Sequence, residues 1–124
     1  MPDAHEILNM FSCMNVEIRY HAQFLKDAKR LAKRYPSFKK DYVSFLDQLT
    51  KNPLLGVSLG KGVRKLRLAI TSKGKGKSGG ARVLTFVVDL KSDDSYEVTL
   101  LTMYDKEEID NVSDTYIKYL LETM

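Results

Sequence analysis

Positions 56 to 88 hold eight basic residues and no acidic residue, and two of the basic residues, Lys65 and Arg67, are one residue apart. The run from 63 to 71 alternates apolar and polar residues as a strand does. We therefore expect Lys65 and Arg67 on one sheet face and Leu66 and Leu68 on the other. Two such cations can hold a phosphate, and an arginine can bind two of its oxygens at once. The pattern equally suits two side chains that only face solvent.

Other segments are expected to bring further cations to the same end of the sheet. Arg82 opens the next strand run, Lys73, Lys75 and Lys77 lie in the glycine-rich turn between the two runs, and Lys106 follows the last strand run. Such a cluster could bind an RNA backbone and stabilise the charge that develops on a phosphate when a 2′-hydroxyl attacks it. A solvated basic loop is the alternative that charge alone leaves open.

Other chemistries lack the residue patterns they need. The triplet Gly76-Lys77-Ser78 ends like a phosphate-binding loop, but Thr71 stands where the first glycine of that motif is required, and a strand run follows in place of a helix. His5 lies in the N-terminal extension and His21 where the first strand meets the first helix, so nothing supports their meeting in a two-histidine site, and His21 is expected to be a helix-entry residue. No His, Cys and Asp residues have metal-ligand spacing, so we expect neither a metal nor a cofactor.

Two predicted helices precede the basic segment. After a first strand in residues 14–20, apolar residues recur at helical spacing from Phe24 to Tyr35, and lysines and arginines occupy the outer face. Pro36 ends this helix. A second amphipathic helix starts near Phe38, and Asn52-Pro53 ends it. The two helices should form a hairpin that packs on a sheet.

Three strand runs supply that sheet, namely Val63 to Thr71, Ala81 to Leu90 and Tyr96 to Tyr104. Short connections between them predict an antiparallel meander. A last helix is expected from Asp105 to Leu121, with Asp105, Glu107 and Glu108 in its first turn. The predicted order is β-α-α-β-β-β-α: an α+β fold in which a small antiparallel sheet packs against a helical hairpin and a C-terminal helix follows.

The length of 124 residues and the net charge of +4 fit one basic globular domain. We expect this domain to span residues 14–124, with residues 1–13 as an extension or alternative start. The lone cysteine, Cys13, suits a reducing compartment, and no apolar run approaches the roughly 20 residues needed to cross a bilayer. These features favour a cytoplasmic protein.

The segments 62–69, 73–83 and 100–106, taken in this order, resemble the RelE/HigB-type toxins of the RelE/ParE toxin–antitoxin superfamily. The helical hairpin ending at Asn52-Pro53 is also similar, so the resemblance covers about residues 14–122. It implies a RelE-like fold and a metal-independent endoribonuclease that cleaves mRNA, often on the ribosome, and so inhibits translation. It also implies neutralisation by a cognate antitoxin, for which a helix-turn-helix protein is expected.

The resemblance places the family's basic strand pair on Lys65 and Arg67 and the arginine after the glycine-rich turn on Arg82. We expect a catalytic set of Lys65, Arg67, Arg82, Tyr104 and Lys106, and RNA contacts from Arg64, Lys73, Lys75 and Lys77. The chain departs from RelE at Glu107, where RelE has an arginine, and near Ser113, where RelE has a tyrosine. The general base therefore stays open between Tyr104, Tyr116 and a lysine, and Tyr104 equally suits a half-buried strand end.

Two other functions remain open from the sequence. One is a ParE-like inhibitor of DNA gyrase, which shares the superfamily but is not a nuclease. The other is a nucleic-acid-binding module without catalytic activity. The clustered strand cations favour the ribonuclease, and measured RNA cleavage would separate the three.

Overall fold

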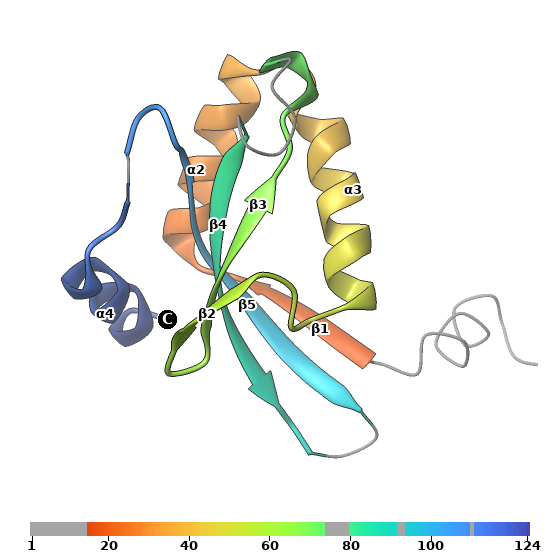
Figure 1. The fold of residues 1–124 in the computed structure, drawn as a ribbon, viewed down its shortest axis with the longest axis vertical. Coiled ribbons are helices and arrows are strands. Elements are labelled where there is room, and N and C mark those ends of the chain that lie inside the picture. Colours follow the sequence, from red (N-terminus) through yellow and green to blue (C-terminus); the bar gives the residue numbers. More distant parts are fainter. Residues whose placement is uncertain (1–14, 74–79, 92–93, 110) are drawn as a thin grey trace, which may run out of the picture.

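Two helices cover one face of a five-stranded sheet, and a shorter helix lies on the other face (Figure 1). The computed structural model describes residues 15–73, 80–91, 94–109 and 111–124. The predicted extension 1–13 and the cations Lys75 and Lys77 lie outside these ranges. The described chain is α+β, as the sequence predicts.

The sheet has the strand order β1-β5-β4-β3-β2. Strands β3 (Val63–Leu68), β4 (Ala81–Asp89) and β5 (Ser95–Asp105) form the predicted antiparallel meander. Strand β1 (Asn15–Tyr20) lies parallel to β5 at one edge, so the sheet is mixed and the prediction of a purely antiparallel sheet was wrong. Strand alternation shows which residues share a face but not which way a strand runs, so the pattern of β1 could not reveal this pairing.

Strand β2 (Val57–Gly60) was missed, and it forms a hairpin with β3 at the other edge. All four of its residues are exposed, so they show no alternation of buried and exposed positions. Lys61 and Gly62 make the turn with φ values of +55° and +82°, as in the two-residue turns that match strand twist. The true order is therefore β-α-α-β-β-β-β-α.

The helical hairpin consists of α2 (Ala22–Arg34) and α3 (Phe38–Lys51). His21 caps the start of α2, because its Nδ1 accepts a hydrogen bond of 2.9 Å from the Gln23 N–H. The hairpin and the sheet bury one core between them, formed by Phe24, Leu31, Phe38, Phe45, Leu49, Leu66, Leu68, Ile70, Ala81, Val83, Val98, Leu100 and Met103. The helical aromatic residues Phe24, Phe38 and Phe45 therefore belong to the core.

Strand β3 ends earlier than predicted, at Leu68, and a 3-10 turn, η1 (Thr71–Lys73), follows. The start of α3 holds this turn. Asp41 accepts a 2.8 Å hydrogen bond from Thr71 N–H, and Ser37 Oγ accepts a 2.9 Å hydrogen bond from Ser72 N–H. These bonds take the backbone groups that a longer strand would have used.

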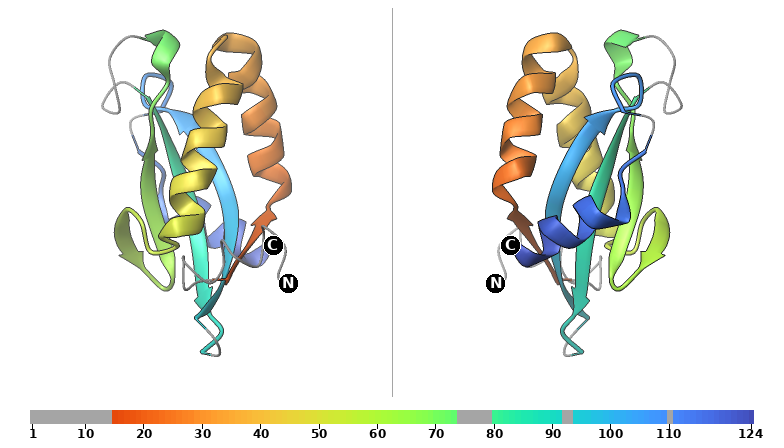
Figure 2. Two further views of the ribbon diagram at one scale, coloured as in Figure 1. Left: turned by 90° about the vertical axis from the view of Figure 1, so that its right-hand side faces the viewer. Right: turned by 90° about the vertical axis from the view of Figure 1, so that its left-hand side faces the viewer.

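Helix α4 (Asp114–Glu122) is nine residues long and crosses the sheet face opposite the hairpin (Figure 2). Its buried Leu120 joins a second cluster with Val63, Leu84, Leu101 and Tyr104. The predicted start at Asp105 was wrong: Ser113 is the N-cap and accepts a 3.1 Å bond from Tyr116 N–H. Asp105 is instead the last residue of β5 and is fully buried.

Candidate nucleic-acid interface

Three of the predicted site residues form one row across three neighbouring strands. Arg67 on β3 lies directly opposite Arg82 on β4, and Arg82 lies directly opposite Tyr104 on β5. Residues directly opposite one another point to the same face of a sheet. The structure thus brings together Arg67, Arg82 and Tyr104 in what we call the arginine row.

The arginine row runs from solvent into the core. Arg67 is exposed, Arg82 is only 6% exposed, and Tyr104 is 2% exposed. Tyr104 belongs to the apolar cluster that packs under α4. Arg67 can therefore meet a ligand directly, whereas Tyr104 lies below the surface.

Lys65 lies on the same face as Arg67, as strand alternation predicts, while Leu66 and Leu68 between and beyond them are buried on the hairpin side. Its Nζ donates a 3.3 Å hydrogen bond to Oδ1 of Asn111, in the segment before α4. Among the described residues, neither Lys65 nor Arg67 takes part in an ion pair. Their positive charges are therefore not neutralised by any described carboxylate.

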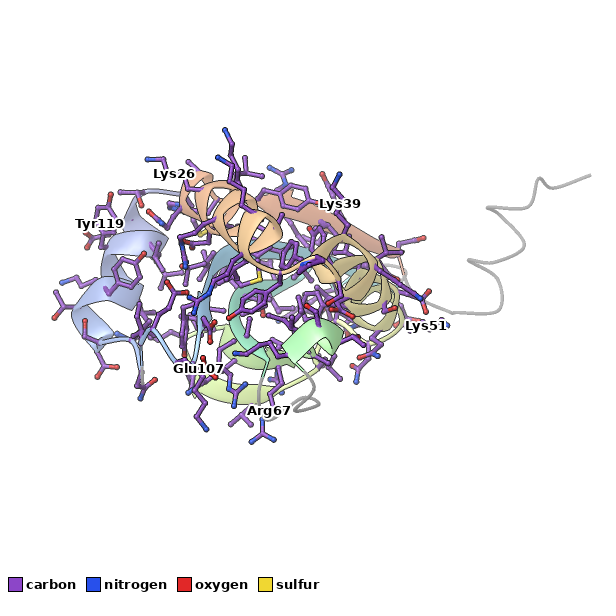
Figure 3. The ribbon with its side chains drawn as sticks, turned by 90° about the horizontal axis from the view of Figure 1, so that it is seen from above. Lys26, Lys39, Lys51, Arg67, Glu107 and Tyr119 are labelled. Carbon is purple, nitrogen blue, oxygen red and sulfur yellow. The ribbon has the colours of Figure 1, made fainter. Side chains whose placement is uncertain are left out.

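Figure 3 shows how the labelled cations are distributed around the sheet. Arg67 projects outward on the side away from α2, whose Lys26 points out on the opposite side. Glu107 lies toward the same side as Arg67. Lys106, also predicted for the site, is exposed in the turn that follows β5.

Arg64 does not join this face. By strand alternation it points to the side opposite Lys65 and Arg67. Its Nε donates a 3.1 Å bond to the Leu55 carbonyl and its guanidinium a 2.9 Å bond to the Gly56 carbonyl. The Arg64 side chain therefore holds the segment that leads into β2, and the RNA contact predicted for it stays a prediction.

Lys73, predicted to contact RNA from the glycine-rich turn, is the last residue of the 3-10 turn η1. Its Nζ lies 2.9 Å from Oδ1 of Asp105 and 3.7 Å from the Glu107 carboxylate, and its side chain is 5% exposed. The turn η1 places the Lys73 ammonium beside Asp105, the last residue of β5. The positive charge of Lys73 is therefore paired with a carboxylate of this chain.

Asp105 is the centre of this buried cluster. Its carboxylate also accepts a hydrogen bond from the Tyr35 hydroxyl, and Arg34 lies 3.8 Å away. Burial opposes its charge, but the hydrogen bonds from Tyr35 and Lys73 prevail and lower the pKa of Asp105 to about 2. Burial and the bond to Asp105 raise the pKa of Tyr35, while the bond to Asp105 overcomes burial and raises the pKa of Lys73.

No local pattern could have predicted this cluster, because Tyr35, Lys73 and Asp105 lie far apart in the chain. Asn111, the partner of Lys65, was missed for the same reason. His21 is confirmed as a helix-entry residue, and its Nε2 lies 2.8 Å from Oγ1 of Thr123 at the end of α4.

The chain matches no known protein-family model. In the ranges that the structure describes, no three His, Cys, Asp or Glu side chains gather in an arrangement that could hold a metal ion. Within the same ranges, every helix is too short or too polar to cross a membrane.

Proposed function

We propose that this protein is the toxin of a type II toxin–antitoxin pair of the RelE/HigB type and cleaves mRNA without a metal ion. The observation that carries the proposal is the pairing of Arg67 with Arg82 at directly opposite positions on β3 and β4. Like charges at such positions destabilise a sheet. Arg67 is exposed and has no ion-pair partner among the described residues, so a phosphate bound to Arg67 would offset part of that repulsion.

The arginine row suits phosphate chemistry. When a 2′-hydroxyl attacks the neighbouring phosphate, negative charge builds up on the phosphate oxygens, and fixed cations stabilise it most when they need not move. Arg67 and Lys65 are open to the ligand, and Arg82 is held in place by burial. In this scheme Lys65 and Arg67 contact the reacting phosphate, and Arg82 stabilises the same charge from its buried position beside Arg67. Lys106 binds RNA at the end of β5.

Tyr104 takes a different role in this scheme. A group that is 2% exposed cannot reach a proton on the RNA without a change in structure. We therefore assign Tyr104 to positioning Arg82, its cross-strand partner, rather than to proton transfer.

Under this proposal the partners are mRNA, on or off the ribosome, and a cognate antitoxin of the helix-turn-helix type, and the protein acts in the cytoplasm. The basic outer face of α2, where Lys26, Lys29 and Lys33 are exposed, would add attraction for RNA without base specificity.

Expression of the full chain without an antitoxin tests the function. Growth should stop, and incorporation of labelled amino acids should fall before incorporation of labelled thymidine, with new 5′ ends in mRNA. If replication stopped first, with DNA breaks and intact mRNA, the gyrase-inhibitor reading would replace this one. Purified protein that bound RNA and never cut it would indicate a binding module without activity.

A further inference from the structure

A groove lies between the β2–β3 hairpin and α4, next to the arginine row. It encloses about 690 Å³, within the range of roughly 300–1,000 Å³ that is typical of small-molecule sites. Its apolar lining comes from Leu59, Val63, Val112, Ile117 and Leu121. The space and the apolar surface suit the flat face of one nucleotide base.

Lysines line the groove together with these apolar side chains. Lys61, Lys65 and Lys118 contribute to it, against one described carboxylate, Asp114. The left-handed backbone of the β2–β3 turn holds Lys61 at its place, with φ at +55°. The lysines would attract the phosphates on either side of a bound base.

Asn111 is the group in the groove that could read a base. Its Oδ1 accepts hydrogen bonds from Lys65 Nζ at 3.3 Å and from Val112 N–H at 3.0 Å. With the oxygen taken, the amide nitrogen offers a ligand two N–H donors that no described residue accepts. A base edge that presents acceptors would satisfy them.

We propose that this groove is a subsite for one base of single-stranded RNA next to the cleaved phosphate, with Asn111 as a specificity-determining residue. Lys65 carries the connection, because it lines the groove and also stands on the face of Arg67. An RNA strand can thus contact the arginine row and the groove at once. This continuity favours RNA over a peptide, and it makes the subsite rest on the function proposed above.

The test uses the full chain and short RNA oligomers that carry 2′-O-methyl groups, so that no 2′-hydroxyl can attack. Binding is followed by NMR shifts of the backbone amides for oligomers that differ in one base. The amides of Lys61, Asn111 and Ile117 should shift. Asn111→Ala should weaken the preferred oligomer about fivefold, the usual effect of one lost hydrogen bond, and leave the others nearly unchanged.

Lys118→Ala should weaken every oligomer alike and lower the salt dependence by about 0.7 in log–log slope, as expected for one lost phosphate contact to a single strand. Lys39→Ala, which removes the same charge from the exposed surface of α3, is the matched control and should behave as wild type.

The outcomes separate the subsite from the proposed function. If oligomers shifted Arg67 and its neighbours but not the groove, or if Asn111→Ala weakened all oligomers equally, the subsite would be overturned, the cleavage function would stand, and the groove would be left to a peptide partner. If the groove shifted but unmodified RNA was never cut, the cleavage function would fail and the groove would stand as an RNA-binding site.

Discussion

Asp105, the last residue of β5, joins three segments of the chain. Its carboxylate binds Tyr35, which follows α2, and Lys73, which ends the turn η1. A buried carboxylate is stable only with partners of this kind. Removal of its charge would leave the Lys73 ammonium buried without its closest counter-charge.

We predict that Asp105→Asn lowers the free energy of unfolding by about 3–5 kcal/mol, the usual cost of breaking a buried ion pair from one side. Urea denaturation measures it. The double variant Asp105→Asn with Lys73→Met should recover part of the loss, because it no longer buries an unpaired charge. A double variant that is less stable than Asp105→Asn would contradict this account of the pair.

The pKa of Asp105 also gives the sign of a pH effect. Because folding lowers this pKa to about 2, its contribution to stability is complete above the pKa of the unfolded chain, about 3.9, and is lost as the pH falls toward 2. Asp105→Asn should therefore lose less stability than wild type over that interval.

Strand alternation predicts which side chains share a sheet face, but not which groups they bind. The shared face of Lys65 and Arg67 follows from period two alone, and the structure confirms it. The partners of Arg64 and Lys73 could not be predicted, because one is a pair of backbone carbonyls and the other a carboxylate 32 positions away. Both depend on tertiary contacts rather than on local pattern.

Helix α4 begins directly after its N-cap, Ser113, and not at Asp105, where the acidic residues begin. The acidic run from Asp105 to Glu108 resembles a first helical turn, but Asp105 Oδ1 accepts the Glu107 N–H at 2.9 Å and stabilises a turn instead. Ser113 then supplies the acceptor that a helix start requires. The apolar spacing predicted the existence of the helix, and tertiary contacts of Asp105 decided its start.

Ser113→Ala should lower the stability of the protein by about 1 kcal/mol, the usual cost of a lost N-cap. Thermal unfolding measures it, and Ser44→Ala on the exposed surface of α3 should change stability by less than about 0.5 kcal/mol. The direction of the stability change separates the two possible starts of α4. If the helix began near Asp105, Ser113 would lie inside it, and Ser113→Ala would raise the stability.

For the whole molecule, the acidic C-terminal third neutralises only some of the basic residues. Asp105 and Glu108 pair with Lys73, Arg30 and Arg34. On the opposite face, Lys65 and Arg67 have no ion-pair partner among the described residues. The fold thus pairs part of its positive charge with carboxylates and leaves Lys65 and Arg67, on the opposite sheet face, without such a pair.

These open cations would supply the positive charge that a metal ion supplies in other nucleases. We therefore expect purified protein to cleave a defined RNA at the same rate in excess EDTA as in buffer alone. Cleavage that stopped in EDTA and returned with magnesium would contradict the metal-free scheme.

The arginine row is tested most directly by single-turnover cleavage of one RNA at saturating protein. Arg67→Ala should cut about 10²- to 10³-fold more slowly, because it removes a fixed donor to the developing charge, and Arg67→Lys should recover part of the rate. Arg82→Ala should lose a similar factor. Arg67 is exposed, so its variants should fold with stability changes below about 0.5 kcal/mol. Lys29→Ala, which removes the same charge from the exposed face of α2, should cut like wild type. If Lys29→Ala and Arg67→Ala lost activity equally, and both recovered fully at higher protein concentration, the cations would serve only as a diffuse attraction and the arginine row would not be the active site.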